Sequence, residues 1–559
     1  MGLESVVCEL RILFSCALRR KSEEAPIDHT VFGKPKLTMP VLGCEMPNLP
    51  LAEGCEIVKV PHDLMREVSK RVGTVFAVPE YCEKEFGLHK HRVIDELQTM
   101  SNRHLMKTPV PDKGSKAWVA FCRQMRLLAR RVGRVPSASI KCVLEGKTGR
   151  RKKRFFQGIM ELAAAEVTKK DGRISAMQKL EMYEVHKIAK KEDRGIQFRS
   201  VKYNVALARE LHNIEKRVIG MHVPYKGNQY HPVMKGATPQ QRAERLAIAS
   251  SWFKVPRYLL LDHHRFDAHV HLWLLKMEQE YKKCRRGYAK LLHQLLKMQL
   301  RNIGRTAGGI VYKIEGKRCS GDINTGLGNT ILNFCIMMAW LEESGVEGVV
   351  TLDGDDSVII IEKDDFDKLL PLEEFMKKLG MVTEMEVTDS FWKAEFCQSR
   401  PMLVDGTVRY VRNPHKILAT VAQSAERVDE TVAEQNVRAS CLCELAMNGS
   451  CPIISPYCWR IMDTIGEGPT RLNAQQLWKA EQYAIKFDLP EKKEPDDLSR
   501  YTMYLAWDID PTMQKVLEEQ TIFYGNLLGK SSKRKRKPKS VEYDVETEWS
   551  GRVVPHCDC

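Results

Sequence analysis

The stretch TLDGDDSVIII, residues 351–361, places three carboxylates, Asp353, Asp355 and Asp356, between two apolar runs. Branched aliphatic residues on both sides of a tight polar turn are typical of a β-hairpin, and Gly354 suits the bend. An acidic hairpin tip implies no function when it is taken alone. Other segments of the sequence must therefore show which groups or ions neutralise these negative charges.

A second acidic site ends another apolar run, in LLLDHHRFD (259–267), which contains Asp262 and Asp267. Two acidic strand ends brought side by side would repel each other unless divalent cations lay between them. Ligands that are all oxygen favour Mg²⁺, with Mn²⁺ as the alternative, over zinc. A pair of such ions is suited to phosphoryl transfer.

A third polar segment, RCSGDINTGLGNTILN (318–333), lies between the two acidic sites. Its glycines, Gly321 among them, permit a loop with close backbone approach. Ser320 lies in this loop, and Thr325 and Asn329 fall one helical turn apart on the same face of the helix expected from about Gly326. Polar groups on an otherwise apolar helix indicate hydrogen bonding to a neighbouring element.

In this order, Asp-x4-Asp, Ser-Gly-x3-Thr-x3-Asn and Gly-Asp-Asp resemble motifs A, B and C of viral RNA-dependent RNA polymerases. Flanking stretches are similar to the polymerases of tombusviruses and their relatives over roughly residues 140–460. They are KTGRRKKRFF (147–156), DGRISAMQKLE (171–181), DRGIQFRSVKYNVALAREL (193–211), KAEFCQSRPM (393–402) and CELAMNGSCPIISPYC (443–458).

The resemblance implies catalytic and metal-binding roles. Asp262 and Asp355 would bind two Mg²⁺ ions, with Asp356 as a weaker or indirect ligand. The ions would activate the primer 3′-hydroxyl and offset charge on the phosphates.

It also implies how the nucleotide is recognised. Asp267 and Asn329 would form a hydrogen-bonded pair that reads the ribose 2′-hydroxyl, supported by Ser320 and Thr325. A hydrogen bond that only packs two helices together is the alternative reading of this pair.

Basic residues are expected to hold phosphates. Arg194 and Arg199, with Lys191 and Lys179 beside them, would bind the incoming triphosphate, although Arg-x4-Arg is also common on solvated loops. The template channel would be lined by a basic run and by a glycine that allows close approach of RNA. These RNA-binding candidates are Arg150, Arg151, Lys152, Lys153, Arg154 and Gly321. A solvated surface loop is the alternative for the basic run.

Several residues do not fit this pattern directly. Asp353 is expected to point to the other face of the hairpin, away from the metal site. His263 and His264 are interpreted as tolerated substitutions rather than metal ligands, because a two-metal polymerase site uses oxygen. Cys397 is expected to be a buried structural thiol. The acid that protonates pyrophosphate is left open among Lys377, Lys378 and Lys393.

The expected fold is α+β, a right-hand polymerase with an antiparallel palm sheet. A strand at 257–262 should lead to a helix over 268–283 and a loop-rich piece over 284–320. The domain boundaries follow from the resemblance and the composition. They are an N-terminal extension (1–110), fingers (111–254 and 285–319), palm (255–284 and 320–412), thumb (413–528) and a basic tail (529–559).

Composition adds the expected partners. A net charge of +16 over 559 residues favours template and product RNA, besides ribonucleoside triphosphates. Seventeen scattered cysteines indicate reduced thiols in a host cytoplasm, and no zinc-site spacing occurs. Residues 5–21 suit an in-plane membrane helix or a helix docked on the protein itself, so host membranes and other viral replication proteins are further candidate partners.

These features predict RNA synthesis on an RNA template, in replication complexes associated with membranes, for a positive-strand RNA virus. A catalytically inactive RNA-binding scaffold is one alternative, which the intact Asp262, Asp355 and Asp356 disfavour. A reverse transcriptase is the other alternative. The pair of Asp267 and Asn329 disfavours it, because this pair would accept the ribose 2′-hydroxyl that a DNA-synthesising site excludes.

Overall fold

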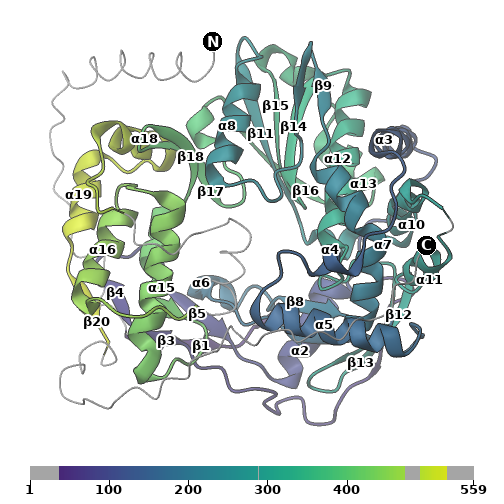
Figure 1. Cartoon of the computed structure of the whole chain (residues 1–559), viewed down its shortest axis with the longest axis horizontal. Helices are drawn as coiled ribbons and strands as arrows, with labels where there is room; N and C mark the ends of the chain where they lie inside the picture. The colour runs from purple at the N-terminus through teal and green to yellow at the C-terminus, as the bar shows by residue number, and fades with distance from the viewer. Residues whose placement is uncertain (1–36, 288, 473–490, 526–559) are drawn as a thin grey trace, which may run out of the picture.

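A computed structural model describes residues 37–287, 289–472 and 491–525 of the chain (Figure 1). Two sequence predictions, the membrane-surface helix at 5–21 and the basic tail at 529–559, lie outside the described residues. Within those ranges, no helix is both long enough and apolar enough to cross a lipid bilayer.

A four-stranded antiparallel sheet, in the order β14-β15-β11-β16, forms the centre of the molecule. Its strands are β11 (Pro256–His263), β14 (Gly348–Asp353), β15 (Asp356–Glu362) and β16 (Thr383–Thr388). The predicted hairpin is present, with Asp353 facing Asp356 across the turn. Strands β14 and β15 are buried on both faces, which explains their continuous runs of branched aliphatic residues.

Helices cover the central sheet on both sides (Figure 1). They include α3 (Lys116–Val132), α7 (Val201–Ile219), α8 (Pro239–Ser250), α12 (Thr325–Ser344) and α13 (Leu372–Lys378). Helix α12, which the sequence predicts from about Gly326 as a mostly apolar helix, is almost wholly buried. It ends at Gly345, whose φ of +65° suits the left-handed helix cap.

A second, five-stranded sheet has the order β2-β13-β12-β6-β8 and joins distant parts of the chain. Its strands are β2 (Glu56–Lys59), β6 (Ile174–Gln178), β8 (Gly195–Phe198), β12 (Arg301–Thr306) and β13 (Val311–Glu315). Helices in this half of the molecule are α2 (Val93–Thr99), the π-helix η2 (Met100–His104), α4 (Ile140–Leu144) and α5 (Gly149–Ala164). Helix α6 (Val185–Ile188) packs instead against the short strands β5 (Phe86–His89) and β7 (Tyr183–Glu184).

The C-terminal part is helical and has a hydrophobic core of its own. Its elements are the hairpin β17 (Ser399–Val404) and β18 (Thr407–Arg412), and helices α14 (Pro414–Thr420), α15 (Glu430–Asn448), α16 (Ile454–Ile465), α18 (Asp497–Trp507) and α19 (Pro511–Glu519). This unit lies across from the five-stranded sheet in Figure 1.

Residues 37–110, to which the sequence assigns no role, connect these two sides. Strand β2 joins the five-stranded sheet, while β3 (Thr74–Val75) and β4 (Ala77–Pro79) pair with the C-terminal strands β19 (Gln423–Ser424) and β20 (Ile522–Tyr524). The N-terminal strands run along one edge of the molecule between the two sides (Figure 1). The remaining short strands are β1 (Val41–Leu42), β5 (Phe86–His89), β7 (Tyr183–Glu184), β9 (Val223–Tyr225) and β10 (Asn228–Tyr230).

Two predicted segments differ from the structure. The single helix expected over 268–283 is divided into α9 (Phe266–His269), α10 (Leu272–Glu278) and the 3₁₀-helix η3 (Gln279–Cys284), because the chain restarts at His271, whose side chain caps α10 by accepting from the Trp273 amide. The piece expected to be rich in loops, 284–320, contains α11 (Lys290–Lys297) and the strands β12 and β13. The 3₁₀-helix η4 (Lys363–Lys368) lies between β15 and α13, and a short 3₁₀-helix η5 (Phe391–Lys393) follows β16.

The core beneath α12 provides a test of the fold. Trp340 is fully buried, and its indole nitrogen donates to the Leu370 carbonyl oxygen at 2.9 Å. Trp340→Ala should lower the free energy of unfolding by about 3–5 kcal/mol, because it leaves a cavity and an unpaired carbonyl. Val119→Ala, on the exposed side of α3, should change it by less than about 0.5 kcal/mol. Urea denaturation followed by circular dichroism measures both, and equal midpoints would contradict this packing.

Candidate active site

Three predicted carboxylates meet at one edge of the central sheet. Asp262 follows Leu261, which pairs with Ser357, so Asp262 lies next to Asp356 on the neighbouring strand. Asp355 occupies the turn between β14 and β15, beside Gly354, whose φ is +72°. Strand register therefore brings residues from distant parts of the sequence to one place.

The carboxylates at this edge repel one another. Burial and then Asp355 and Glu384 raise the pKa of Asp262, and His263 opposes the shift. Burial and then Asp355 raise the pKa of Asp356 to about 7, and Asp262 adds to the effect. A divalent cation would relieve this repulsion, so the donor types fit a hard metal ion bound by oxygen. Among the described residues, however, no three His, Cys, Asp or Glu side chains converge closely enough to hold a metal ion.

Asp353 does not point away from this site, which makes its predicted orientation wrong. Because Asp353 pairs with Asp356 across the hairpin, the two side chains share a face and line one cavity. Its charge is neutralised by Arg242 of α8, whose Nη2 donates to Asp353 Oδ2 at 2.6 Å.

The cavity beside Asp356 has a volume of about 880 Å³ and is lined by several basic side chains. Arg151, Lys235, Arg242 and Arg245 line it, together with Cys397. Arg151 belongs to the predicted basic run, so this part of the run does reach the space beside the acidic edge.

The basic run itself is helical rather than a loop. Arg150, Arg151, Lys152, Lys153 and Arg154 lie exposed in the first turns of α5. Cations at a helix N-terminus are unfavourable because the helix dipole is positive there. The helix dipole therefore does not account for the cations at this position.

The predicted pair of Asp267 and Asn329 is formed. Asn329 Nδ2 donates to Asp267 Oδ1 at 2.9 Å, and Arg318 Nε donates to Asn329 Oδ1 at 3.0 Å. Arg318 is itself held by the buried carboxylate of Glu278. Burial and Asp355 raise the pKa of Asp267, which places it beside the acidic edge. Sequence reasoning missed Arg318 and Glu278, because nothing in their local pattern marks them.

Ser320, Gly321 and Thr325 have other partners than those predicted. The Thr325 hydroxyl donates to the Cys319 carbonyl at 2.8 Å, and the Ser320 hydroxyl lies 3.4 Å from backbone atoms of β8. The Gly321 amide donates to the Gln197 carbonyl at 2.8 Å, and a Cβ on Gly321 would lie 2.7 Å from that oxygen. These residues fasten the loop before α12 to β8, so the RNA contact predicted for Gly321 has no support in this packing.

The family profile described as viral RNA dependent RNA polymerase matches residues 84–522. The chain belongs to this polymerase family. It is similar to the RNA-directed RNA polymerases of Tobacco necrosis virus (strain A), Red clover necrotic mosaic virus and Carnation mottle virus, with 30%, 29% and 28% identity over 67%, 81% and 75% of this chain. The chain spans 52%, 61% and 55% of those three proteins. The predicted resemblance to polymerases of the tombusvirus-like group is confirmed.

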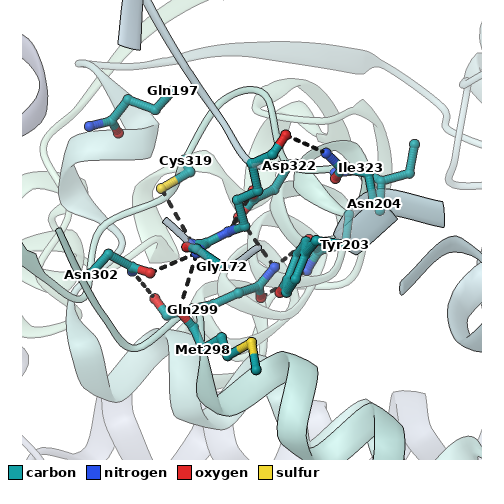
Figure 2. Close-up of polar contacts among 12 residues, drawn as sticks. Gly172, Gln197, Tyr203, Asn204, Met298, Gln299, Asn302, Cys319, Asp322 and Ile323 are labelled. Atoms are coloured by element: carbon teal, nitrogen blue, oxygen red, sulfur yellow. Dashed lines mark hydrogen bonds and ion pairs between the residues drawn. The ribbon is translucent and has the colours of Figure 1, made fainter. Parts of the chain in front are cut away.

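Arg199 is not placed to bind a nucleotide. Its side chain is fully buried and its Nε donates to both Asp322 oxygens, at 2.9 and 3.1 Å. Its Nη1 donates to Asn302 Oδ1 at 2.6 Å and to the carbonyls of Gly172 and Met298. Figure 2 shows these partners gathered in one buried cluster. The predicted triphosphate role of Arg199 is contradicted, because no part of its guanidinium is left for a phosphate.

The other predicted phosphate ligands are divided. Arg194 is 55% exposed and its Nε lies 4.0 Å from Glu181 Oε2, and the Lys179 ammonium pairs with the other oxygen of the same carboxylate. Burial and then Arg103 lower the pKa of Lys191, and Asp262 opposes the shift, so Lys191 lies close to the acidic edge.

Two arginines that the sequence did not indicate, Arg103 and Arg265, lie near Lys191 and form a cationic cluster with it. Arg265 Nη2 and Arg103 Nη1 lie 2.7 and 3.7 Å from the two oxygens of the buried Glu192. Burial and then Arg194 lower the pKa of Arg103, and Asp267 is among the groups that oppose the shift. Arg265 has a φ of +46°, an uncommon conformation for a residue with a side chain and one that is frequent at functional sites. Its position between Asp262 and Asp267 was a signal available in the sequence.

Cys397 is closer to the site than a purely structural thiol would be. Its Sγ accepts from Arg242 Nη1 at 3.3 Å, and the thiol hydrogen bonds to Asp356. Burial and then Asp356 raise the pKa of Cys397, which disfavours the reactive thiolate form. Both Cys397 and Gln398 have positive φ, which marks a tight turn before β17.

The buried environment of Arg199 gives a direct test of its role. Arg199→Ala should lower the free energy of unfolding by about 3–5 kcal/mol, because Asp322 would remain buried without its cation. Arg194→Ala should change stability by less than about 0.5 kcal/mol. Thermal unfolding of both purified variants measures the difference. A stable Arg199→Ala protein with a raised KM for nucleotides would restore the phosphate-binding role.

Proposed function

We propose that this protein synthesises RNA on an RNA template, by nucleotidyl transfer, and so replicates the genome of a positive-strand RNA virus. The observation that carries the proposal is the convergence of Asp262, Asp355 and Asp356 beside the hydrogen-bonded pair of Asp267 and Asn329. The three aspartates suit catalysis of phosphoryl transfer, and the pair suits recognition of ribose. Membership of the polymerase family supports both assignments.

The same proposal assigns parts of a right hand. The palm comprises residues 255–284 and 320–412, which contain the four-stranded sheet. The fingers comprise 111–254 and 285–319, and the thumb comprises 413–528. Residues 37–110 then link the fingers to the thumb through β2, β3 and β4.

The proposed cofactor is Mg²⁺, with Mn²⁺ as the alternative. Asp262 and Asp355 would hold the ions, with Asp356 next to them, because mutual repulsion of these carboxylates favours a bound cation. When bound, the ions would activate the attacking 3′-hydroxyl and offset the charge that develops on the phosphates.

The pair of Asp267 and Asn329 would select ribonucleotides. Arg318 holds the Asn329 oxygen, so the asparagine amide is directed at Asp267. A substrate 2′-hydroxyl can join this arrangement, whereas a deoxyribose would leave buried polar groups without a partner.

The incoming triphosphate would be bound by the cluster of Arg103, Lys191, Arg194 and Arg265. Arg103, Lys191 and Arg265 lie beside Glu192, and Arg194 lies near Arg103. The cluster also lies beside Asp262 and Asp267, which compensates for the negative charge of that edge. Template RNA would contact the exposed basic turns of α5 through its phosphates.

Location and further partners are also proposed. The described cysteines are free thiols, which suits the reducing host cytoplasm. Association with host membranes or other viral replication proteins would involve segments such as 5–21, which lie outside the described residues.

Nucleotide incorporation on a short primed RNA tests the activity. The double variant Asp355→Asn, Asp356→Asn should lower incorporation by about a thousandfold or more, because several kcal/mol of transition-state stabilisation depend on the metal site. Asp364→Asn, an exposed carboxylate just beyond β15, is the matched control and should remain active. Removing Mg²⁺ should abolish wild-type incorporation. An active double variant would contradict the proposal.

Ribose selection is tested by comparing kcat/KM for ATP and dATP. Wild-type protein should prefer ATP, and Asn329→Ala should reduce that preference by roughly ten- to hundredfold, equivalent to one or two buried hydrogen bonds. Asn228→Ala, in the exposed hairpin of β9 and β10, should leave the preference unchanged. An unaltered preference in Asn329→Ala would remove this role.

A further inference from the structure

The turn that carries Asp355 is held from inside the protein by one side chain. Asn333 lies on α12, one helical turn beyond Asn329, and is completely buried. Its Nδ2 donates to the carbonyl oxygens of Gly354 and Asp355, at 3.1 and 2.9 Å. Both carbonyls face inward at a tight turn and need a donor in this place.

Asn333 is one member of a series of hydrogen bonds in which the donor and the acceptor of each bond can be assigned. Carbonyl oxygens can only accept, so the Asn333 amide nitrogen must face the turn and its Oδ1 must face His263. His263 Nε2 lies 3.0 Å from that oxygen and is therefore the protonated nitrogen. His263 Nδ1 then accepts from the Thr383 hydroxyl at 2.7 Å.

Every member of this chain is buried and fully engaged. Thr383 is 7% exposed, His263 is 5% exposed, and Asn333 is not exposed. Because both ring nitrogens of His263 are used, it is not available as a metal ligand. It is also more than a tolerated substitution, because its ring links β16 to α12.

The chain touches the acidic edge at two points. His263 directly follows Asp262 on β11, and Asn333 binds the backbone of Asp355. Asp262 at the end of β11 and Asp355 in the adjacent hairpin turn lie at the same edge of the sheet, so their like charges repel each other. Fixed hydrogen bonds behind both residues oppose their separation.

We propose that Thr383, His263 and Asn333 are positioning residues that set the distance between the carboxylates of Asp262 and Asp355. The inference rests on the proposed function, because it concerns the same site. The three residues act through the backbone, touch neither substrate nor metal, and determine how well the two strand ends are aligned for nucleotidyl transfer.

Isosteric variants test the chain with little loss of packing. Asn333→Asp replaces the donor by a carboxylate oxygen, which would repel the two turn carbonyls. Its kcat for nucleotide incorporation should fall by about ten- to hundredfold, because small displacements of reacting groups have effects of that size. The KM for ATP should stay within about twofold, because Arg194, Arg265 and the pair of Asp267 and Asn329 are unchanged.

Variants of His263 provide a graded comparison. His263→Leu removes both hydrogen bonds and should lower kcat as Asn333→Asp does. His263→Gln retains an amide donor for Asn333 and should recover part of the activity. Thr383→Val, at the far end of the chain, should have the smallest effect of the three.

Two controls separate positioning from a general effect of mutating this region. His264→Ala changes the exposed neighbour of His263. Thr330→Val changes a buried hydroxyl of α12 that has no hydrogen-bond partner among the described residues. Both should keep kcat within about twofold of wild type.

Hydrogen exchange on the same proteins gives a readout that does not require activity. Amides of residues 353–357 should exchange at least about tenfold faster in Asn333→Asp than in wild type or Thr330→Val, because the turn loses its inner donor. Unchanged exchange there would overturn the inference even if the protein proved to be inactive. Unchanged kcat in Asn333→Asp and His263→Leu, or a rise in KM alone, would also overturn it. Inactive wild-type protein with the expected exchange difference would count against the proposed function only.

Discussion

Carboxylates at the end of the central sheet repel one another, and the surrounding structure has to hold them together against this repulsion. The register of β11 and β15 brings Asp262 beside Asp356, and the hairpin turn adds Asp355. Such an arrangement is costly unless the backbone holds it and a cation relieves it. Buried hydrogen bonds from α12 and strand pairing on both sides of β11 hold the backbone in place. These bonds use backbone groups, so the carboxylates themselves stay available to bind a cation.

Other buried charges in this region are matched within the protein. Arg242 pairs with Asp353, Arg199 with Asp322, and Arg318 with Glu278. These pairs connect α8 to the hairpin, β8 to the loop before α12, and α10 to that same loop. Breaking one would leave a buried charge without a partner, so the pairs fix relative positions of elements. Asp356 differs in lining a cavity, where its side chain is hydrogen-bonded to the Cys397 thiol rather than paired with a cation of its own.

Sequence patterns predicted the parts of the site that are local. The hairpin, the apolar helix after Asn329 and the acidic strand end each have a signature within about twenty residues. The pair of Asp267 and Asn329, which is not local, was implied by the resemblance to polymerase motifs. Roles set by distant contacts could not be predicted. Arg199 looked like a phosphate ligand because its partner Asp322 lies far along the chain, and Asp353 was misplaced because Arg242 comes from another helix. Arg103 carried no local signal at all.

The strand pairs made by residues 37–110 have a consequence for how the protein is made. Strand β4 pairs with β20, and β3 pairs with β19, so early strands depend on partners from the other end of the described chain. During synthesis on the ribosome, Ala77–Pro79 must wait without a partner until Ile522–Tyr524 has emerged. Such distant pairing slows folding and leaves strand edges open to misassociation in the meantime. A nascent chain cut short before β20 would therefore leave β4 without its strand partner.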